Sequence, residues 1–296
     1  MVRDKVFSLL GDRPHVKNPK HQVLSEEKED TFIVETLLLD LNGIESVPAY
    51  FIKPIDSEGP LPLVFFHHSH GGNYTLGRKE VLKGNHYLQP VSFAKELTDM
   101  GFAVLAIDAW AFNERSGKKE SEVFKEMLIT GKVMWGMMMY DNIHALDYVL
   151  TRPDVDAFRV ANIGMSMGGM TAWWLAALDE RIKVTVDIGG QVDMDTIIDS
   201  RLLDKHNFYF YVPKLHKYFS TFDIQALIAP RKRLSLVGRY DMNCPIAGVR
   251  SLEKQLTHHY EKAGVPSNFR QVITSGGHIE TAHMRAEWKN FLKENI

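Results

Sequence analysis

Cysteine is almost absent from the 296-residue sequence, and the single Cys244 excludes an internal disulfide and any metal site built from several cysteines. No apolar run approaches the roughly 20 residues that a membrane-spanning helix needs. The opening stretch, MVRDKVFSLLGDRPH, also lacks the apolar core of a secretory signal, because its longest apolar run is short and Asp4 interrupts the beginning. We therefore expect a soluble, cytoplasmic protein.

A dominant charge is lacking as well, because 35 Lys and Arg residues nearly balance 37 Asp and Glu residues and leave a net charge of −2. Such a chain has no general attraction to nucleic acid or to an anionic membrane, and we expect neither as a partner. The sequence contains no repeat of fixed period, no low-complexity tract and no linker rich in Pro, Gly or Ser. We therefore predict an N-terminal extension at 1–30 and a single domain at 31–296.

What the chain does contain is a series of short apolar runs. Two of them flank the turn signal Asn42-Gly43, which predicts an antiparallel hairpin. Later runs are typical of strands buried on both faces, and stretches with helical periodicity separate them. The expected strands cover 31–41, 47–54, 63–68, 102–108, 159–164, 183–190, 233–238 and 269–275. This alternation predicts right-handed crossovers and a mostly parallel sheet of about eight strands.

The helical stretches leave one segment without a clear pattern. The expected helices cover 91–101, 121–150, 169–179, 244–264 and 278–296. The longest of them contains Gly131 and Gly136, either of which could interrupt it. Residues 191–230 lose clear periodicity and are rich in Tyr, Phe and His, so we expect them to form a cover, or lid, over a pocket.

The stretch GMSMGGM at 164–170 stands where an apolar strand gives way to an apolar helix. A G-x-S-x-G pattern at such a junction is the nucleophile elbow, in which the two outer glycines leave room for a strained turn that exposes the serine oxygen. A tight packing corner between strand and helix would explain Gly164 and Gly168 but not the serine. We interpret Ser166 as a nucleophile.

A serine hydroxyl becomes a good nucleophile only when a base takes its proton. Where an elbow carries the serine, the acid and the base follow it in chain order, each after a later strand. Asp241 follows one predicted strand and His278 follows the next, so all three side chains are expected at the carboxyl edge of the sheet. The sequence thus predicts a triad of Ser166, Asp241 and His278, with Asp193 as the alternative acid.

The negative oxygen that forms during such a reaction needs two N–H donors. We expect the first from the backbone of Met167, directly after the serine. The second should come from the loop after strand 63–68, where we predict the backbone N–H of His70, with Ser69 or Gly72 as alternatives. The His-rich HHSH in this loop could also suggest a metal, but no carboxylate or cysteine is positioned to complete such a site, and we expect none.

Several segments together carry a resemblance that is more specific than the elbow alone. They are VPAYFIKP, PLVFFHHSHGG, AIDAWAFNERSG, RPDVDAFRVANIGMSMGG, LIAPRKRLSLVGRYDMNCP and GGHIETAHMRAEWKNFL. From about residue 31 onward the chain resembles α/β-hydrolases of the dienelactone hydrolase and acetyl xylan esterase type. The resemblance implies an α/β-hydrolase fold and a cofactor-free serine esterase that acts on a small-molecule carboxylic ester.

The same resemblance assigns the nucleophile to Ser166, the acid to Asp241 and the base to His278. Two departures from the family pattern stand out. The usual His-Gly after the first parallel strand is His68-Ser69 here. Dienelactone hydrolase itself uses a cysteine nucleophile, so the serine points to the esterases. A serine peptidase of the oligopeptidase type and a hydrolase fold that only binds a ligand are the alternative functions. Peptidases of that type carry a large additional domain.

Aromatic and methionine side chains allow two interpretations. The run MWGMMMY at 134–140, together with Trp110, Phe112, Trp173 and Trp174, could line a hydrophobic acyl pocket under the lid. The same residues could instead pack the core, because Met fills irregular gaps anywhere in a protein interior.

Overall fold

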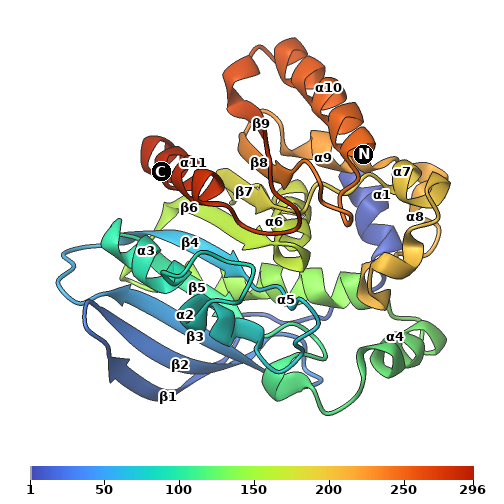
Figure 1. The fold of residues 1–296 in the computed structure, drawn as a ribbon. Coiled ribbons are helices and arrows are strands. Elements are labelled where there is room, and N and C mark those ends of the chain that lie inside the picture. The colour runs from blue at the N-terminus through green and yellow to red at the C-terminus, as the bar shows by residue number, and fades with distance from the viewer. Residues whose placement is uncertain (1) are drawn as a thin grey trace.

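A computed structural model describes residues 2–296 and shows one continuous twisted sheet with helices on both sides (Figure 1). Within those residues the sheet has nine strands in the order β1-β2-β3-β5-β4-β6-β7-β8-β9. The strands are β1 (His21–Lys28), β2 (Phe32–Asp40), β3 (Ser46–Pro54), β4 (Leu61–His67), β5 (Ala103–Ile107), β6 (Val155–Met165), β7 (Val184–Ile188), β8 (Lys232–Gly238) and β9 (Phe269–Thr274). Three pairs at one edge are antiparallel: β1 with β2, β2 with β3, and β3 with β5. All later pairs in this order, from β5–β4 to β8–β9, are parallel.

The predicted mostly parallel sheet with an N-terminal antiparallel hairpin is confirmed, but the expected count of about eight strands was one too low. The additional strand is β1, which lies in the segment that the sequence assigns to an extension. Most of its side chains are exposed, so it carries no apolar pattern that a sequence reading could detect. It is held at the sheet edge by backbone pairing with β2.

Helices cover both faces of the sheet (Figure 1). One apolar core lies under α1, α5 and α6, and a second lies under α3 and α11 on the other face. The longer helices are α1 (Val2–Leu9), α3 (Phe93–Asp99), α4 (Glu120–Ile129), α5 (Met134–Val149), α6 (Met167–Leu178), α10 (Ile246–Lys262) and α11 (Ala282–Asn295). The shorter helices are α2 (Glu80–Lys83), α7 (Met194–Asp199), α8 (Leu215–Tyr218) and α9 (Thr221–Gln225).

The long helical stretch is interrupted at Gly131, between α4 and α5. This glycine has φ +75°, a left-handed conformation that other residues adopt at a cost. Gly136, in contrast, lies inside α5, and a Cβ added there would be 1.8 Å from the Leu10 carbonyl oxygen. One glycine therefore ends a helix, and the other allows the end of α1 to approach α5 closely.

The methionine-rich run belongs to the core. Met134, Met137, Met138 and Met139 are at most 2% exposed on α5, and Trp173 and Trp174 are equally buried on α6. Of the two interpretations that the sequence allows, core packing is the one that these residues fit. No helix within residues 2–296 is long and apolar enough to cross a membrane.

Candidate active site

Ser166 stands at the sharp turn from β6 into α6 and has φ +55° and ψ −118°. A serine rarely adopts a positive φ, and such strain persists only where the surrounding structure enforces it. Here the serine N–H donates a 2.8 Å hydrogen bond to the Ile188 carbonyl on the neighbouring strand β7. A Cβ on Gly168 would lie 1.9 Å from the His67 carbonyl oxygen, so only glycine permits this approach of α6 to β4.

Three side chains that are far apart in the sequence form a continuous chain of hydrogen bonds. The distance from His278 Nε2 to Ser166 Oγ is 2.8 Å, and His278 Nδ1 lies 2.7 Å from Asp241 Oδ2. An ionised carboxylate only accepts hydrogen bonds, so the imidazole donates from Nδ1 and is left with Nε2 to accept from the serine hydroxyl. This arrangement can draw a proton from the serine.

Asp241 is held in place from its other oxygen. It is 3% exposed in the turn after β8, and its Oδ1 accepts from the backbone N–H groups of Asn243 at 2.8 Å and Cys244 at 3.2 Å. These two amides orient the carboxylate so that Oδ2 faces the imidazole of His278. That histidine lies in the loop between β9 and α11, and its side chain is 23% exposed. Substrate and water can therefore reach the imidazole.

The alternative acid Asp193 has a different partner. It caps the N-terminus of α7, where its Oδ2 accepts from the backbone N–H of Thr196 at 3.3 Å and from its hydroxyl at 2.7 Å. Within residues 2–296, Asp241 is the acid in hydrogen-bond contact with His278.

The three candidate N–H donors of the loop after β4 differ in whether they are already engaged. The Ser69 N–H donates to Glu80 Oε1 at 2.8 Å, and the Gly72 N–H donates to the ring Nδ1 of His70 at 2.9 Å. Within residues 2–296 no hydrogen bond is found for the N–H of His70. The N–H of Met167 is in the first turn of α6, where amides have no partner within the helix.

A cavity of about 180 Å³ lies beside Ser166. Residues 70–72 of the β4 loop, Met170, residues 189 and 192, residues 205–207 and 209, Asn243 and His278 complete its lining. Tyr209 connects the segment 191–230 to the β4 loop, because its hydroxyl is 3.2 Å from the ring Nε2 of His70. The predicted cover at 191–230 thus supplies a cation, a histidine, an amide and a phenol to the cavity. The sequence signal for these residues was only the aromatic and His-rich composition of an irregular segment.

Two histidines in this cavity stay neutral at pH 7. Burial, together with smaller contributions from the neighbouring histidines His68 and His278, lowers the pKa of His70 to about 4. Burial also lowers the pKa of His206. Neither ring therefore brings a positive charge close to His278 when that residue accepts a proton. Within residues 2–296 no group of three or more His, Cys, Asp or Glu side chains could hold a metal ion.

Comparison with known proteins gives related sequences and related folds. A profile of the prolyl oligopeptidase family matches residues 91–294. YtaP of Bacillus subtilis (strain 168), provisionally described as a hydrolase, is 53% identical over 292 residues, which cover 99% of this chain and 98% of that protein.

Solved structures that share this fold include two esterases. A glucuronoyl esterase from Solibacter usitatus has a TM-score of 0.68 at 17% identity, over 98% of this chain and 91% of its own. An acetyl xylan esterase from Paenibacillus sp. R4 has a TM-score of 0.65 at 17% identity, over 100% of this chain and 93% of its own. These likenesses establish a common fold. Since the family profile spans well over half of the residues, the chain belongs to the prolyl oligopeptidase family, within the α/β-hydrolases.

Proposed function

We propose that this protein is a serine hydrolase that cleaves carboxylic esters, with Ser166 as the nucleophile, His278 as the general base and Asp241 as the acid that orients it. The observation that carries the proposal is the pair of hydrogen bonds, 2.8 Å and 2.7 Å long, that links the three side chains. The strained backbone of Ser166 adds support, because strain of this kind gathers at functional sites.

The reaction runs through an acyl-enzyme. Ser166 Oγ attacks the ester carbonyl carbon while its proton passes to His278 Nε2. The N–H groups of Met167 and His70 hold the resulting oxyanion. Collapse breaks the ester C–O bond, and His278 gives its proton to the departing alkoxide. Water then attacks the acyl-enzyme with His278 again as base, and the carboxylic acid leaves. Asp241 keeps the imidazole in the required tautomer and stabilises its protonated form.

The cavity indicates the size and character of the acyl group. About 180 Å³ is below the range of most drug-sized ligand sites, and much of the lining is polar. The methionine run that could have formed an acyl pocket is in the core instead. We therefore expect acetyl and similar short acyl groups to be preferred over long chains. The fold shared with an acetyl xylan esterase agrees with this choice.

Peptide hydrolysis is the second candidate, and the match to the prolyl oligopeptidase family favours it. The same nucleophile and base would serve for an amide bond. Aminoacyl p-nitroanilides and p-nitrophenyl esters, compared at equal concentration, separate the two functions. We expect the ester to be cleaved with a kcat/KM at least about 100-fold higher.

The proposal is tested by hydrolysis of p-nitrophenyl esters, from acetate to octanoate, by the wild type and Ser166→Ala. We expect the substitution to lower kcat by about 10³-fold or more, because the residual rate comes only from binding and the oxyanion donors. The wild type should prefer acetate. Ser251→Ala, which removes an exposed serine hydroxyl on α10, is the matched control and should leave kcat unchanged.

Labelling with a fluorophosphonate probe gives an independent reading, because the probe needs an activated serine but no particular ester. Wild type should be labelled at Ser166, and Ser166→Ala should not. If wild type and Ser166→Ala hydrolysed the esters equally fast, the turn at Ser166 would serve only to pack the strand against the helix. The assignment of Ser166 as the nucleophile would then be wrong.

A further inference from the structure

Two loops must keep a fixed distance for the proposed reaction. One carries the His70 N–H, which faces the oxyanion, and the other carries His278, which takes the proton. Both loops are bound to the same short segment, residues 85–89, which precedes α3. We infer that Tyr87 is a positioning residue that sets the oxyanion loop relative to the loop of the base. This inference rests on the proposed function and assigns a role to a residue outside the three hydrogen-bonded side chains.

The first half of the link is a buried carboxylate. Glu80 on α2 is 0% exposed and accepts from the Ser69 N–H at 2.8 Å and from the Ser69 hydroxyl at 2.9 Å. It also accepts from the Tyr87 hydroxyl at 2.8 Å and from the Asn85 amide at 3.0 Å. The Ser69 and Tyr87 oxygens are themselves 2.5 Å apart. Glu80 and Tyr87 therefore hold the backbone one residue before His70.

The ring of Tyr87 also packs against the loop that carries His70. A Cβ on Gly71 would lie 2.3 Å from its Cε1, so the ring contacts the Gly71 backbone directly. Burial raises the pKa of the Tyr87 hydroxyl, and the negative charge of Glu80 raises it further. The phenol thus stays protonated at all ordinary pH values, and its single proton can always be donated. The link does not switch off within the pH range of the reaction.

The second half of the link runs from the backbone of Tyr87 to the loop of the base. The Tyr87 carbonyl accepts from the N–H of Glu280 at 2.8 Å, two residues after His278. Gln89 adds two hydrogen bonds to Glu280, from its backbone N–H to Oε2 at 3.0 Å and from its side chain to the carbonyl at 2.8 Å. The segment 85–89 thus holds both ends of the gap in which the ester must sit.

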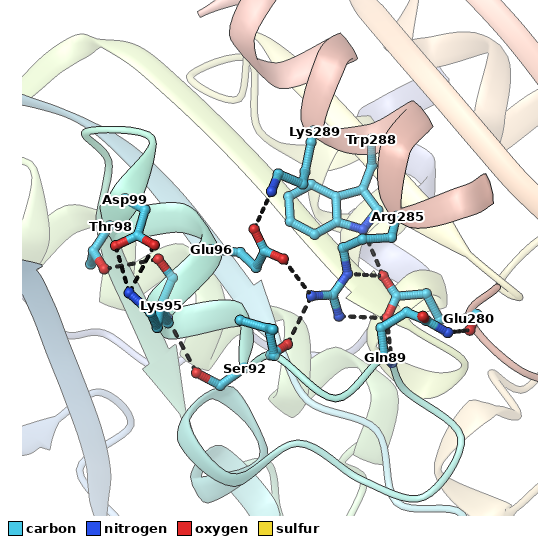
Figure 2. Close-up of polar contacts among 11 residues, drawn as sticks. Gln89, Ser92, Lys95, Glu96, Thr98, Asp99, Glu280, Arg285, Trp288 and Lys289 are labelled. Atoms are coloured by element: carbon cyan, nitrogen blue, oxygen red, sulfur yellow. Dashed lines mark hydrogen bonds and ion pairs between the residues drawn. The ribbon is translucent and has the colours of Figure 1, made fainter. Parts of the chain in front are cut away.

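Figure 2 shows how the far end of the link is anchored in the core. Glu280 is 1% exposed, and Arg285 donates to both of its oxygens at 2.7 Å. The Trp288 indole donates to the same carboxylate at 2.7 Å. A second acid, Glu96 on α3, pairs with Arg285 at 3.3 Å. Bidentate Arg–carboxylate pairs combine strength with fixed geometry, so the end of the base loop is rigidly held against α11.

The chemical need for such a link is a matter of distance. Oxyanion donors act at 2.7–3.1 Å, and a misplacement of about 1 Å can lower a rate by about 100-fold. Loss of the Tyr87 hydroxyl removes its contacts with Ser69, Glu80 and Asn85 but leaves the ring and the carbonyl. We expect the position of the His70 N–H to be less fixed, while the hydrogen bonds among Ser166, His278 and Asp241 stay unchanged.

The test is the kinetics of p-nitrophenyl acetate hydrolysis by Tyr87→Phe. We expect kcat to fall by about 10-fold to 100-fold, KM to change less than about two-fold, and the pH at half-maximal rate to stay unchanged. Ser69→Ala in the Tyr87→Phe background should lower kcat much less than Ser69→Ala alone, since both hydroxyls act through one network. Gln89→Ala, at a partly exposed residue, loosens the other loop and should also lower kcat with KM retained.

Tyr260→Phe is the matched control. It removes another buried tyrosine hydroxyl, which donates to the Arg231 carbonyl at 3.0 Å, and it should change the melting temperature without changing kcat. The inference would be overturned if kcat of Tyr87→Phe stayed within two-fold of wild type, or if Tyr260→Phe lost as much kcat as Tyr87→Phe. In either case the proposed function would still stand, provided that Ser166→Ala is inactive. Full activity of Ser166→Ala would overturn both.

Discussion

At the scale of single residues, the Ser69 hydroxyl gives the departure from the usual His-Gly pattern a structural role. Ser69 stands where a glycine is common, and its N–H and hydroxyl both bond to the buried Glu80. A glycine there would leave that carboxylate with one donor fewer, and an unsatisfied buried charge is costly. Within residues 2–296 no hydrogen bond is found for the neighbouring amide of His70.

The two candidate acids give opposite predictions. Asp241→Asn should lower kcat by about 10³- to 10⁴-fold, because a neutral amide no longer holds the imidazole in the productive tautomer. Asp193→Ala removes a helix cap and should lower the free energy of unfolding by about 0.5–2 kcal/mol with kcat within a few-fold of wild type. Ester hydrolysis and urea unfolding of both variants check this. A larger kcat loss in Asp193→Ala than in Asp241→Asn would reverse the assignment.

At the scale of elements, the packing of α1 against α5 shows how a glycine inside a helix allows another segment to approach it closely. The Arg3 guanidinium bonds to the Ala177 carbonyl of α6 at 3.0 Å, and the Tyr140 hydroxyl of α5 bonds to the Gly11 carbonyl at 2.6 Å. These contacts attach the N-terminal helix to the core on the face that carries α5 and α6. The absence of a side chain at Gly136 is what lets the chain after α1 come so close.

Gly136→Ala is predicted to destabilise the protein by about 1–3 kcal/mol, because its Cβ would meet the Leu10 backbone, which cannot move like a flexible side chain. Helix propensity alone would make the same change stabilising, so the sign is informative. Thermal or urea unfolding measures it. Gly117→Ala, where nothing lies within 4 Å of the added Cβ, is the control and should change stability little. A stabilised Gly136→Ala would mean that α1 does not pack as described.

At the scale of the whole molecule, the burial of two histidines, one at the end of β4 and one in the loop that follows, makes the stability of the fold depend on pH. His67 is 4% exposed, and burial lowers its pKa to about 3, while that of His70 is lowered to about 4. An unfolded chain would return both to about 6.5. Between these values the unfolded state binds more protons than the folded one. These two histidines therefore lower the free energy of unfolding as pH decreases below about 6.5.

Each of these histidines contributes a slope of up to about 1.4 kcal/mol per pH unit, largest near pH 5. Urea unfolding at several pH values should show that His67→Gln has a slope smaller by about that amount. His283→Gln, at a side chain that is 64% exposed, should retain the wild-type slope. An unchanged slope in His67→Gln would contradict the burial argument.

Much of this architecture could be predicted from local patterns. Buried strands and amphipathic helices leave their period in the sequence, and Asn42-Gly43 and the elbow at 164–170 mark sharp turns through residue type alone. The edge strand β1 could not be predicted, because backbone pairing holds it and its side chains are exposed. The site residues of the cover could not be predicted either, because irregular segments have no period.

The alternation of buried strands and helices from residue 31 onward, and three side chains that each follow the end of a strand, could be predicted from the sequence alone, since both depend on neighbours along the chain. Their catalytic roles stay predictions until Ser166→Ala is measured. Only the tertiary structure decided which amides are free, which acid contacts His278, and that Tyr87 links the loops of His70 and His278. Those facts depend on atoms up to hundreds of residues apart, and local propensity contains no information about such distances.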